Sequence, residues 1–391
     1  MQETRRKSPS HDHLRWGDSS EVGYPIEPAL RGRKQFPAGT QSSAVVVTPN
    51  MSEPRTVVIT GASAGIGRAT ARRFGAAGDN VVLLARGKER LEAAKAEVDR
   101  AGGHGLAIPT DVGDPSQVEA AADRAEKAFG AIDVWIGNAM TAVFAPVWNM
   151  EPEEYRRVTE VTYLGQVYGA LAALKRMRPR NEGKLVFVGS ALAYRGIPLQ
   201  SSYCAAKHAI QGFVDSLRSE LLHDRSGIDL TMVQLSGFNT PQFSWVRNKL
   251  PYQPRPLGKC YQPEVAAEAI FWAASHRRRE LMVGFPAVEA IYGNKLLPQF
   301  GDWILSRQGF QGQETDMRSN GRPDNLFEPV AGDFAAHGIF EDEALDSSRQ
   351  LMLTTHRRET AAIGAAAAGA IALLWWRSRK RNETRGENDH A

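Results

Sequence analysis

Between residues 56 and 285, short runs of β-branched, apolar residues alternate with longer stretches of helical periodicity. Strands that alternate with helices pair in parallel, because each helix carries the chain back along the sheet. We expect strands at 56–60, 80–85, 105–109, 133–137, 184–189, 228–235 and 281–284. We expect helices at 65–77, 88–102, 115–129, 153–178, 202–223 and 263–276. The alternation predicts an α/β fold with a doubly wound, seven-stranded parallel sheet.

Composition permits this fold and excludes one class of function. Charged residues make up 24% and hydrophobic residues 42% of 391 residues, which is typical of globular proteins. The net charge of +4 lies in the tails: residues 1–50 hold seven Lys/Arg and five Asp/Glu, and residues 377–391 hold five and three. A nucleic-acid-binding protein concentrates basic charge on its folded part. We therefore expect no nucleic-acid partner.

Cysteine and histidine show neither a disulfide pattern nor a metal pattern. The two cysteines, Cys204 and Cys260, are too few for a disulfide framework, and no Cys/His cluster has zinc-ligand spacing. We expect no metal site. A reducing, cytoplasmic location fits this cysteine usage.

The sequence TGASAGIG at residues 60–67 follows the first expected strand and opens the first expected helix. Gly61, Gly65 and Gly67 permit a tight turn, so the backbone can approach a pyrophosphate that the free N–H groups of the helix bind. Ser63 and Ile66 lie in the same loop. An ordinary glycine-rich turn is the alternative. The position between strand and helix favours a dinucleotide site of Rossmann type.

The residue after the second expected strand bears on the choice of cofactor. A site that prefers NAD places an acidic residue there for the ribose 2′-hydroxyl. Here the strand Val81–Ala85 is followed by Arg86. A guanidinium pairs with a 2′-phosphate and has no acceptor for a hydroxyl. We expect NADP(H) to be favoured over NAD(H), although a surface arginine at a strand end would look the same.

Tyr203 and Lys207 are four residues apart, and Ser190 stands thirteen residues before the tyrosine. A free tyrosine has a pKa of about 10, too high for ready proton exchange near neutrality. An ammonium one helical turn away favours the phenolate, as does the charge of oxidised nicotinamide. Ser190 ends the apolar run KLVFVGS, so it can bind a substrate oxygen at the edge of the sheet. We expect Tyr203 to act as acid and base.

In this order, with 142 residues between Gly61 and Tyr203, these motifs resemble the short-chain dehydrogenase/reductase family. The resemblance covers about residues 54–285 and implies an NAD(P)-dependent oxidoreductase. It implies catalytic roles for Ser190, Tyr203 and Lys207, and the last two also lie at the cofactor. The remaining cofactor contacts that it implies are Asp111 and Val112 at the adenine, Asn138 and Ala139 beside the central sheet, and Thr240 at the nicotinamide carboxamide. We also expect a homo-oligomer.

Four positions depart from the family pattern, and the first is Gly137, where the family has asparagine. Met140 stands where the family has glycine, which we expect to alter local packing. Thr162 replaces a catalytic asparagine that helps hold a water chain to the lysine, which bears on the proton relay. Ser236 replaces proline before Gly237.

The segments outside the central region make up three further parts. Residues 1–50 are rich in Arg, Ser, Pro and Gly and are expected to be disordered. Because Met51 opens MSEPRTVVITGAS, a typical start for this family, residues 1–50 are either a non-native upstream start or a genuine flexible extension. Residues 51–285 form the expected catalytic domain. Residues 286–355 carry an apolar face between Ile291 and Phe310, which either packs on the core or a partner subunit or covers the substrate site.

Residues 356–391 contain sixteen uncharged residues, 361–376, that end in Trp375-Trp376 and precede the basic run RSRKR. At about 1.5 Å per residue such a helix spans roughly 24 Å, less than the roughly 30 Å of a bilayer core. Tryptophans beside basic residues are typical of interfacial anchors. We expect membrane association, as a transmembrane or an interfacial helix; an alanine-rich soluble helix is the alternative.

The sequence predicts an oxidoreductase that transfers hydride between NADP(H) and an apolar carbonyl or alcohol, with Tyr203 as acid and base. One alternative is an NADP(H)-binding protein with weak turnover, which Thr162, Met140 and Ser236 suggest. The other is a membrane-tethered interaction protein on the same fold. Cofactor binding separates the interaction protein from the other two, and turnover separates enzyme from binder.

Overall fold

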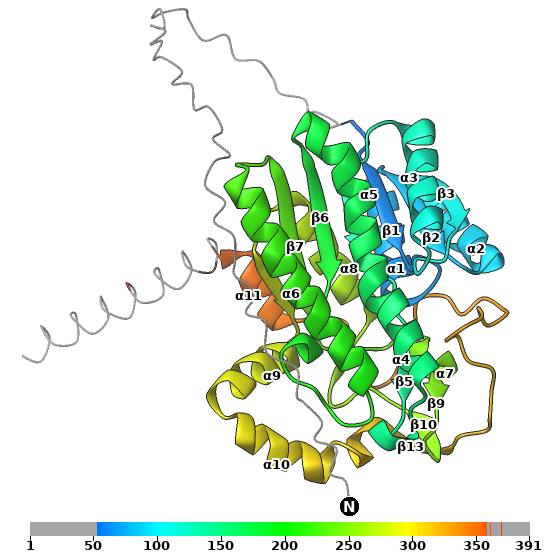
Figure 1. Cartoon of the computed structure of the whole chain (residues 1–391), viewed down its shortest axis with the longest axis vertical. Coiled ribbons are helices and arrows are strands. Elements are labelled where there is room, and N and C mark those ends of the chain that lie inside the picture. Colours follow the sequence, from blue (N-terminus) through cyan, green and yellow to red (C-terminus); the bar gives the residue numbers. More distant parts are fainter. Residues whose placement is uncertain (1–52, 358–359, 361–368, 370–391) are drawn as a thin grey trace, which may run out of the picture. The chain divides into compact units, whose positions relative to one another are not determined.

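The computed structural model describes residues 53–357, 360 and 369. Its centre is a seven-stranded parallel sheet in the order β12-β7-β6-β4-β1-β2-β3 (Figure 1). The strands are β1 Thr56–Thr60, β2 Asn80–Ala85, β3 His104–Pro109, β4 Val134–Gly137, β6 Gly183–Val188, β7 Ile228–Leu235 and β12 Glu280–Val283. The predicted sheet is confirmed, and each strand lies within one residue of its expected bounds.

Helices cover both faces of this sheet. They are α1 Gly65–Gly75, α2 Lys88–Ala101, α3 Pro115–Phe129, α5 Gly165–Arg180, α6 Ser201–His223 and α8 Pro263–Ser275. Alternate residues of a strand face opposite sides. Val57 and Ile59 of β1 therefore pack with α1, α2 and α8, whereas Val58 packs with α3, α5 and α6. The sheet is buried between these two apolar layers.

The helix expected at 153–178 is interrupted. It consists of α4 Pro152–Val158, a π-helical turn η2 Thr159–Leu164, and α5. Thr162 in the π-turn donates to the Thr141 carbonyl oxygen (2.8 Å) and accepts from the Thr141 N–H (3.0 Å). These bonds join the turn to the loop after β4. The periodicity of the sequence does not reveal this widened turn, because it depends on a contact across 21 residues.

Smaller elements gather beyond the carboxyl ends of the sheet strands (Figure 1). Three two-stranded pairs form there: β5 Val143–Phe144 with β9 Arg247–Asn248, β8 Gly237–Phe238 with β11 Cys260–Tyr261, and β10 Tyr252–Pro254 with β13 Glu314–Arg318. The helical elements are α7 Gln242–Trp245, α9 Phe285–Leu296, α10 Pro298–Gln308 and α11 Arg349–Thr355, with single turns η1 Val147–Asn149, η3 Ala191–Ala193 and η4 Gln311–Gln313. Ligands bind at this edge of doubly wound sheets.

Two expected features fall outside the described residues: the extension at 1–50 and the apolar helix at 361–376. In the part of the chain that the structure describes, no helix has both the length and the apolarity needed to cross a membrane.

Candidate active site

The glycine loop joins β1 to α1 in a conformation that depends on its glycines. Gly61 and Gly65 have φ of +67° and +56°, which side chains rarely adopt. A Cβ added to Gly67 would lie 2.2 Å from the Gly61 carbonyl oxygen, so only glycine fits there. Ser63 and Ile66 lie between these positions, and the first turn of α1 has no side-chain cap. The Gly65 N–H donates to the Ala335 carbonyl oxygen (3.2 Å), and the close turn lets a pyrophosphate approach the other N–H groups at the helix N-terminus.

Asn138 and Ala139, which follow β4, contact the glycine loop directly. The Asn138 side-chain amide donates to the carbonyl oxygens of Thr60 (2.9 Å) and Gly61 (3.3 Å). The backbone N–H groups of Asn138 and Ala139 both donate to the Thr60 hydroxyl. A Cβ on Gly61 would lie 2.8 Å from the Ala139 Cα. These two residues therefore hold the end of β4 against the turn.

The other cofactor candidates lie around the same turn. The Thr240 side chain lies 3.3 Å from the position of a Cβ on Gly65, across the groove from the loop. Asp111 forms an ion pair with Arg157 of α4 (2.5 Å), and Val112 is buried against Gly165. The carboxylate of Asp111 is thus already bound by protein. Arg157 had no sequence signal, because α4 approaches Asp111 only in the folded chain.

Arg86 lies at the end of β2, and its guanidinium contacts a distant segment. It donates to the carbonyl oxygens of Phe327 (2.5 Å) and Asn325. Burial lowers its pKa, and the neighbouring Arg157 acts in the same direction. Among the residues described, no carboxylate forms an ion pair with Arg86. A half-buried guanidinium without an ion-paired carboxylate fits an anion such as a 2′-phosphate.

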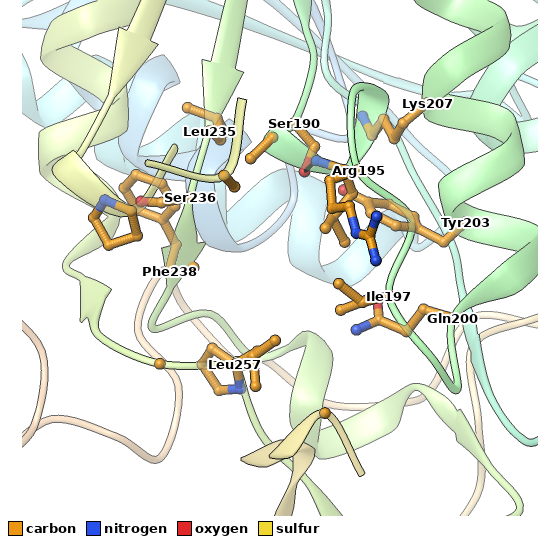
Figure 2. A pocket seen from close by; sticks show the side chains of 18 of the residues that line it. Ser190, Arg195, Ile197, Gln200, Tyr203, Lys207, Leu235, Ser236, Phe238 and Leu257 are labelled. Carbon is orange, nitrogen blue, oxygen red and sulfur yellow. Dashed lines mark hydrogen bonds between the residues drawn. The ribbon is translucent and has the colours of Figure 1, made fainter. Parts of the chain in front are cut away.

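Ser190, Tyr203 and Lys207 line one cavity of about 700 Å³ (Figure 2). Ser190 follows β6, and its hydroxyl accepts from the Leu192 N–H (3.1 Å). Tyr203 and Lys207 lie one turn apart on α6, with the Lys207 Nζ 5.5 Å from the centre of the Tyr203 ring. Lys207 is only 1% exposed, and its Nζ donates to the Val188 carbonyl oxygen (2.8 Å). The edge of the sheet thus brings a hydroxyl, a phenol and an amine together.

Burial governs the protonation of this group. Desolvation raises the pKa of Tyr203 well above its usual value, although the Ser190 hydroxyl acts in the opposite direction. Desolvation lowers the pKa of Lys207 to about 7. Burial is the largest influence on the pKa of Tyr203 in the protein without cofactor, and it acts against the phenolate. That Lys207 favours the phenolate stays a prediction. Near neutrality Tyr203 is a protonated phenol, able to donate a proton.

The structure shows no hydrogen bond between Thr162 and Lys207 among the described residues. The Thr162 side chain is fully buried, and both of its hydrogen bonds go to the backbone of Thr141. At the position of the family asparagine, the chain therefore fixes the loop that carries Met140. Met140 itself lines the cavity, and so does Ser236.

The rest of the cavity is largely apolar. Helices α9 and α10 contribute to its wall. The lining includes Ala290 of α9, Leu297 directly after it, and Phe300, Ile304 and Leu305 of α10. Arg195 also lines it and donates to Asn294 of α9 (3.1 Å) and to Asp302 of α10 (2.5 Å). Sequence reasoning missed Arg195, because its role as a link to α9 and α10 arises from contacts over about a hundred residues.

Comparisons with known proteins agree with this geometry. Residues 55–250 match the family model of short chain dehydrogenases. The chain is 32% identical over 271 residues to the Bacillus subtilis protein named uncharacterized oxidoreductase YxnA, covering 69% of this chain and 76% of that protein. It is 35% identical over 183 residues to dehydrogenase/reductase SDR family member 7B of Bos taurus, covering 45% of this chain and 56% of that protein.

A solved structure shows the same fold. It is an alcohol dehydrogenase of the archaeon Thermococcus sibiricus complexed with 5-hydroxy-NADP. The match has a TM-score of 0.52 and 26% identity, and it covers 59% of this chain and 96% of that one. The family model, the relatives and the shared architecture lead to one conclusion. The chain belongs to the short-chain dehydrogenase/reductase family of oxidoreductases.

Proposed function

We propose that the protein transfers hydride between NADP(H) and an apolar carbonyl or alcohol substrate. The observation that carries this proposal is one apolar cavity lined by Ser190, Tyr203 and Lys207 and reached by Ile66 of the glycine loop. Such an arrangement brings a proton donor and a cofactor cradle to one side of a substrate site.

Each side chain has a distinct part in the proposed reaction. The Ser190 hydroxyl binds the substrate oxygen, and the protonated Tyr203 phenol donates its proton to that oxygen as a carbonyl is reduced. Lys207 lies beneath the tyrosine ring and promotes reprotonation through its own titration near neutrality. When bound, the nicotinamide cofactor supplies or accepts the hydride.

The preference for the phosphorylated cofactor rests on Arg86. A guanidinium has five N–H donors, and two of them reach backbone carbonyls here, which leaves three for a phosphate. The similar archaeal enzyme was solved with an NADP derivative, which supports the same choice.

The substrate is proposed to be apolar because the cavity wall is. Most of the residues contributed by α9 and α10 are hydrocarbon, and Arg195, Gln200 and Asn294 are among the few polar side chains. Residues 286–310 thus cover the substrate site in this proposal. Apolar ligands are held mainly by the area they remove from water, with a few polar groups fixing orientation.

We also propose that residues 361–376 associate with a membrane and that the protein forms a homo-oligomer. Support for the membrane comes from the large apolar side chains that α9 and α10 expose, such as Leu296 at 77% and Trp303 at 50%. An apolar substrate would partition into the same membrane.

The experiment is a screen for NADPH consumption with a panel of ketones and aldehydes. In Tyr203→Phe we expect turnover to fall at least about a hundredfold, while the dissociation constant for NADPH stays within about twofold, because only the proton donor is lost. Tyr292→Phe is the matched control, since Tyr292 is half exposed on α9. Turnover of Tyr203→Phe equal to the parent would exclude Tyr203 as the acid. NADPH binding without turnover on any substrate would favour a binding protein.

A further inference from the structure

The segment between β13 and α11 crosses the cofactor side of the molecule. We call residues 324–341 the strap. It forms no helix or strand, yet it is tied down along its length. Near its start, Leu326 is fully buried, and its carbonyl oxygen accepts from Arg157 Nε (3.1 Å). Near its end, the Phe340 N–H donates to the Asn239 side chain (3.0 Å), beside Thr240.

The middle of the strap lies on the glycine loop. The Gly65 N–H donates to the Ala335 carbonyl oxygen (3.2 Å). Asp333 forms an ion pair with Arg68, the residue after Gly67. His337 contacts Glu264 at the start of α8 (3.0 Å). The strap thus runs from the end of β2, over the glycine loop, to the residue next to Thr240.

No strap residue is among those that line the cavity. Ile66, Asn138 and Thr240 line it, but Arg86, Asp111 and Val112 do not. The first three lie toward the catalytic group, and the last three lie where the adenosine of the cofactor is expected. The strap therefore contacts Arg86 in the expected adenosine half and also reaches the residue beside Thr240.

Arg86 meets the strap through two backbone carbonyls, those of Asn325 and Phe327. These bonds orient the planar guanidinium and leave three N–H donors unused. A backbone carbonyl brings no net negative charge, so these two bonds orient the guanidinium without neutralising it. Asp111 and Glu328 favour its charged form from nearby, without an ion pair in the described residues.

Arg90 is a second cation of the same kind. It is only 6% exposed, and it forms no ion pair or side-chain hydrogen bond with any residue between 53 and 357 that the structure describes. Its guanidinium lies over Trp245 (4.8 Å) and over Phe334 of the strap (5.8 Å). It also lies 3.2 Å from the position of a Cβ on Gly87, directly beside Arg86.

Arg90 is buried and Arg86 is half-buried, and neither forms an ion pair with a carboxylate of the described residues. Two such neighbouring guanidinia are stabilised by an anion that joins them. Burial lowers the pKa of both guanidinia. Arg157 and Arg90 act in the same direction on the pKa of Arg86, and Arg68 does so on that of Arg90, whereas nearby carboxylates partly oppose the shift. A phosphate is the anion that a pair of guanidinia binds best, through several charge-assisted hydrogen bonds.

We propose that the strap positions Arg86 and Arg90 to bind the 2′-phosphate of NADP(H), so that selectivity over NAD(H) depends on residues 324–341. Arg90 is then a second phosphate ligand, and Phe334 and the carbonyls of Asn325 and Phe327 are positioning groups. This inference rests on the proposed function, because it concerns the same cofactor.

The test measures binding rather than turnover, with the full chain and four ligands: NADPH, NADH, adenosine 2′,5′-bisphosphate and AMP. In Arg90→Gln, we expect the dissociation constants for NADPH and the bisphosphate to rise about tenfold, the effect of losing one charge-assisted contact. In Phe334→Ala, which removes the ring that positions Arg90, we expect a smaller rise in the same two constants. Those for NADH and AMP stay within about twofold. Phe310→Ala, which removes a partly exposed ring outside the strap, is the control.

A second variant tests the strap through its anchor. Asp333→Asn weakens the pair with Arg68 and is expected to lower selectivity in the same direction. Its control, Asp342→Asn, removes the same charge from an exposed carboxylate without an ion pair in the described residues. Equal losses for all four ligands would show a merely structural strap and overturn the proposal. Tighter NADPH binding in the strap variants would overturn it too, because the strap would then block the site.

Failure of this inference is distinguishable from failure of the proposed function. If the parent binds NADPH and the strap variants keep its selectivity, the strap proposal is wrong and the cofactor assignment stands. If the parent binds neither dinucleotide, both are wrong.

Discussion

Lys207 shows how the surroundings of one residue set its chemistry. Its amine is almost fully buried and donates to the Val188 carbonyl oxygen. The pKa of about 7 follows from desolvation, since a buried cation is disfavoured against the neutral amine. A lysine that titrates near neutrality can pass a proton to the tyrosine above it, which a lysine with the usual value near 10.4 would do less readily.

This shift predicts a pH-dependent effect on stability. The folded-state pKa lies below that of the unfolded chain, so the unfolded state binds more protons between about pH 7 and 10. The contribution to stability is complete above that window and is lost as the pH falls toward 7. Lys207→Met has no such titration. We therefore expect its thermal midpoint, relative to the parent, to be higher at pH 7 than at pH 9.

The comparison needs both proteins at both pH values, because other groups also titrate. The lost hydrogen bond to Val188 shifts the variant equally at each pH and cancels in the difference. A midpoint difference that is the same at pH 7 and pH 9 would show that Lys207 keeps an ordinary pKa.

At the scale of elements, the start of α1 determines the cofactor cradle. This helix begins at Gly65 directly behind the turn, and its second glycine lies against the Gly61 carbonyl. Helix α6 illustrates the contrary case: Gly212, in its middle, has no atom within 4 Å of the position of an added Cβ. Gly67 and Gly212 both lie in helices, but an added Cβ would clash at Gly67 and would meet open space at Gly212.

These surroundings predict opposite effects of the same substitution. Gly67→Ala forces the turn apart and should cost about 1–3 kcal/mol, as overpacking does, with loss of NADPH binding. Gly212→Ala should stabilise by about 0.5–1 kcal/mol, because alanine restricts the unfolded chain and favours helix. In thermal denaturation we expect midpoints below and above that of the parent, with roughly 2–4 °C per kcal/mol. A Gly67→Ala protein that is as stable as the parent and binds NADPH would refute the close approach.

At the scale of the whole molecule, we propose that the parts outside the sheet determine where the protein acts. The α9–α10 pair lines the cavity on one side and exposes apolar side chains on the other, among them Phe285 and Leu297. The tail proposed to reach a membrane follows α11, which ends at Thr355. In this proposal the tail and the exposed apolar face of α9 and α10 both contact the membrane from which the apolar substrate enters the cavity.

Cell fractionation tests the tail directly. We expect the full chain in the membrane fraction and a chain ending at Thr355 in the soluble fraction, because the tail holds two tryptophans, two leucines and two isoleucines next to basic residues. An interfacial helix should be partly released by high salt, and a spanning one should need detergent. Both chains in the soluble fraction at low salt would make this segment an interaction helix instead.

The sequence by itself determined the sheet, the glycine loop and the catalytic trio. Strand and helix periodicity are local, and the spacing of Tyr203 and Lys207 places both on one face of a helix wherever that helix lies. Parallel strands then bring their carboxyl ends, and with them Ser190, to a common edge. None of these inferences needs a contact between distant segments.

Only the tertiary structure decided what surrounds these residues. Arg86 meets Phe327 across 241 positions, Arg90 is buried beneath Phe334, and α10 forms part of the cavity wall. The direction of the Tyr203 pKa shift also depends on burial, which the α6 sequence does not report. The contacts to Arg86 and Arg90 and the α10 wall arise when the chain after residue 285 folds back over the sheet edge, and Tyr203 is buried mainly by segments between residues 140 and 260. Local sequence patterns do not predict where this distant segment contacts the site.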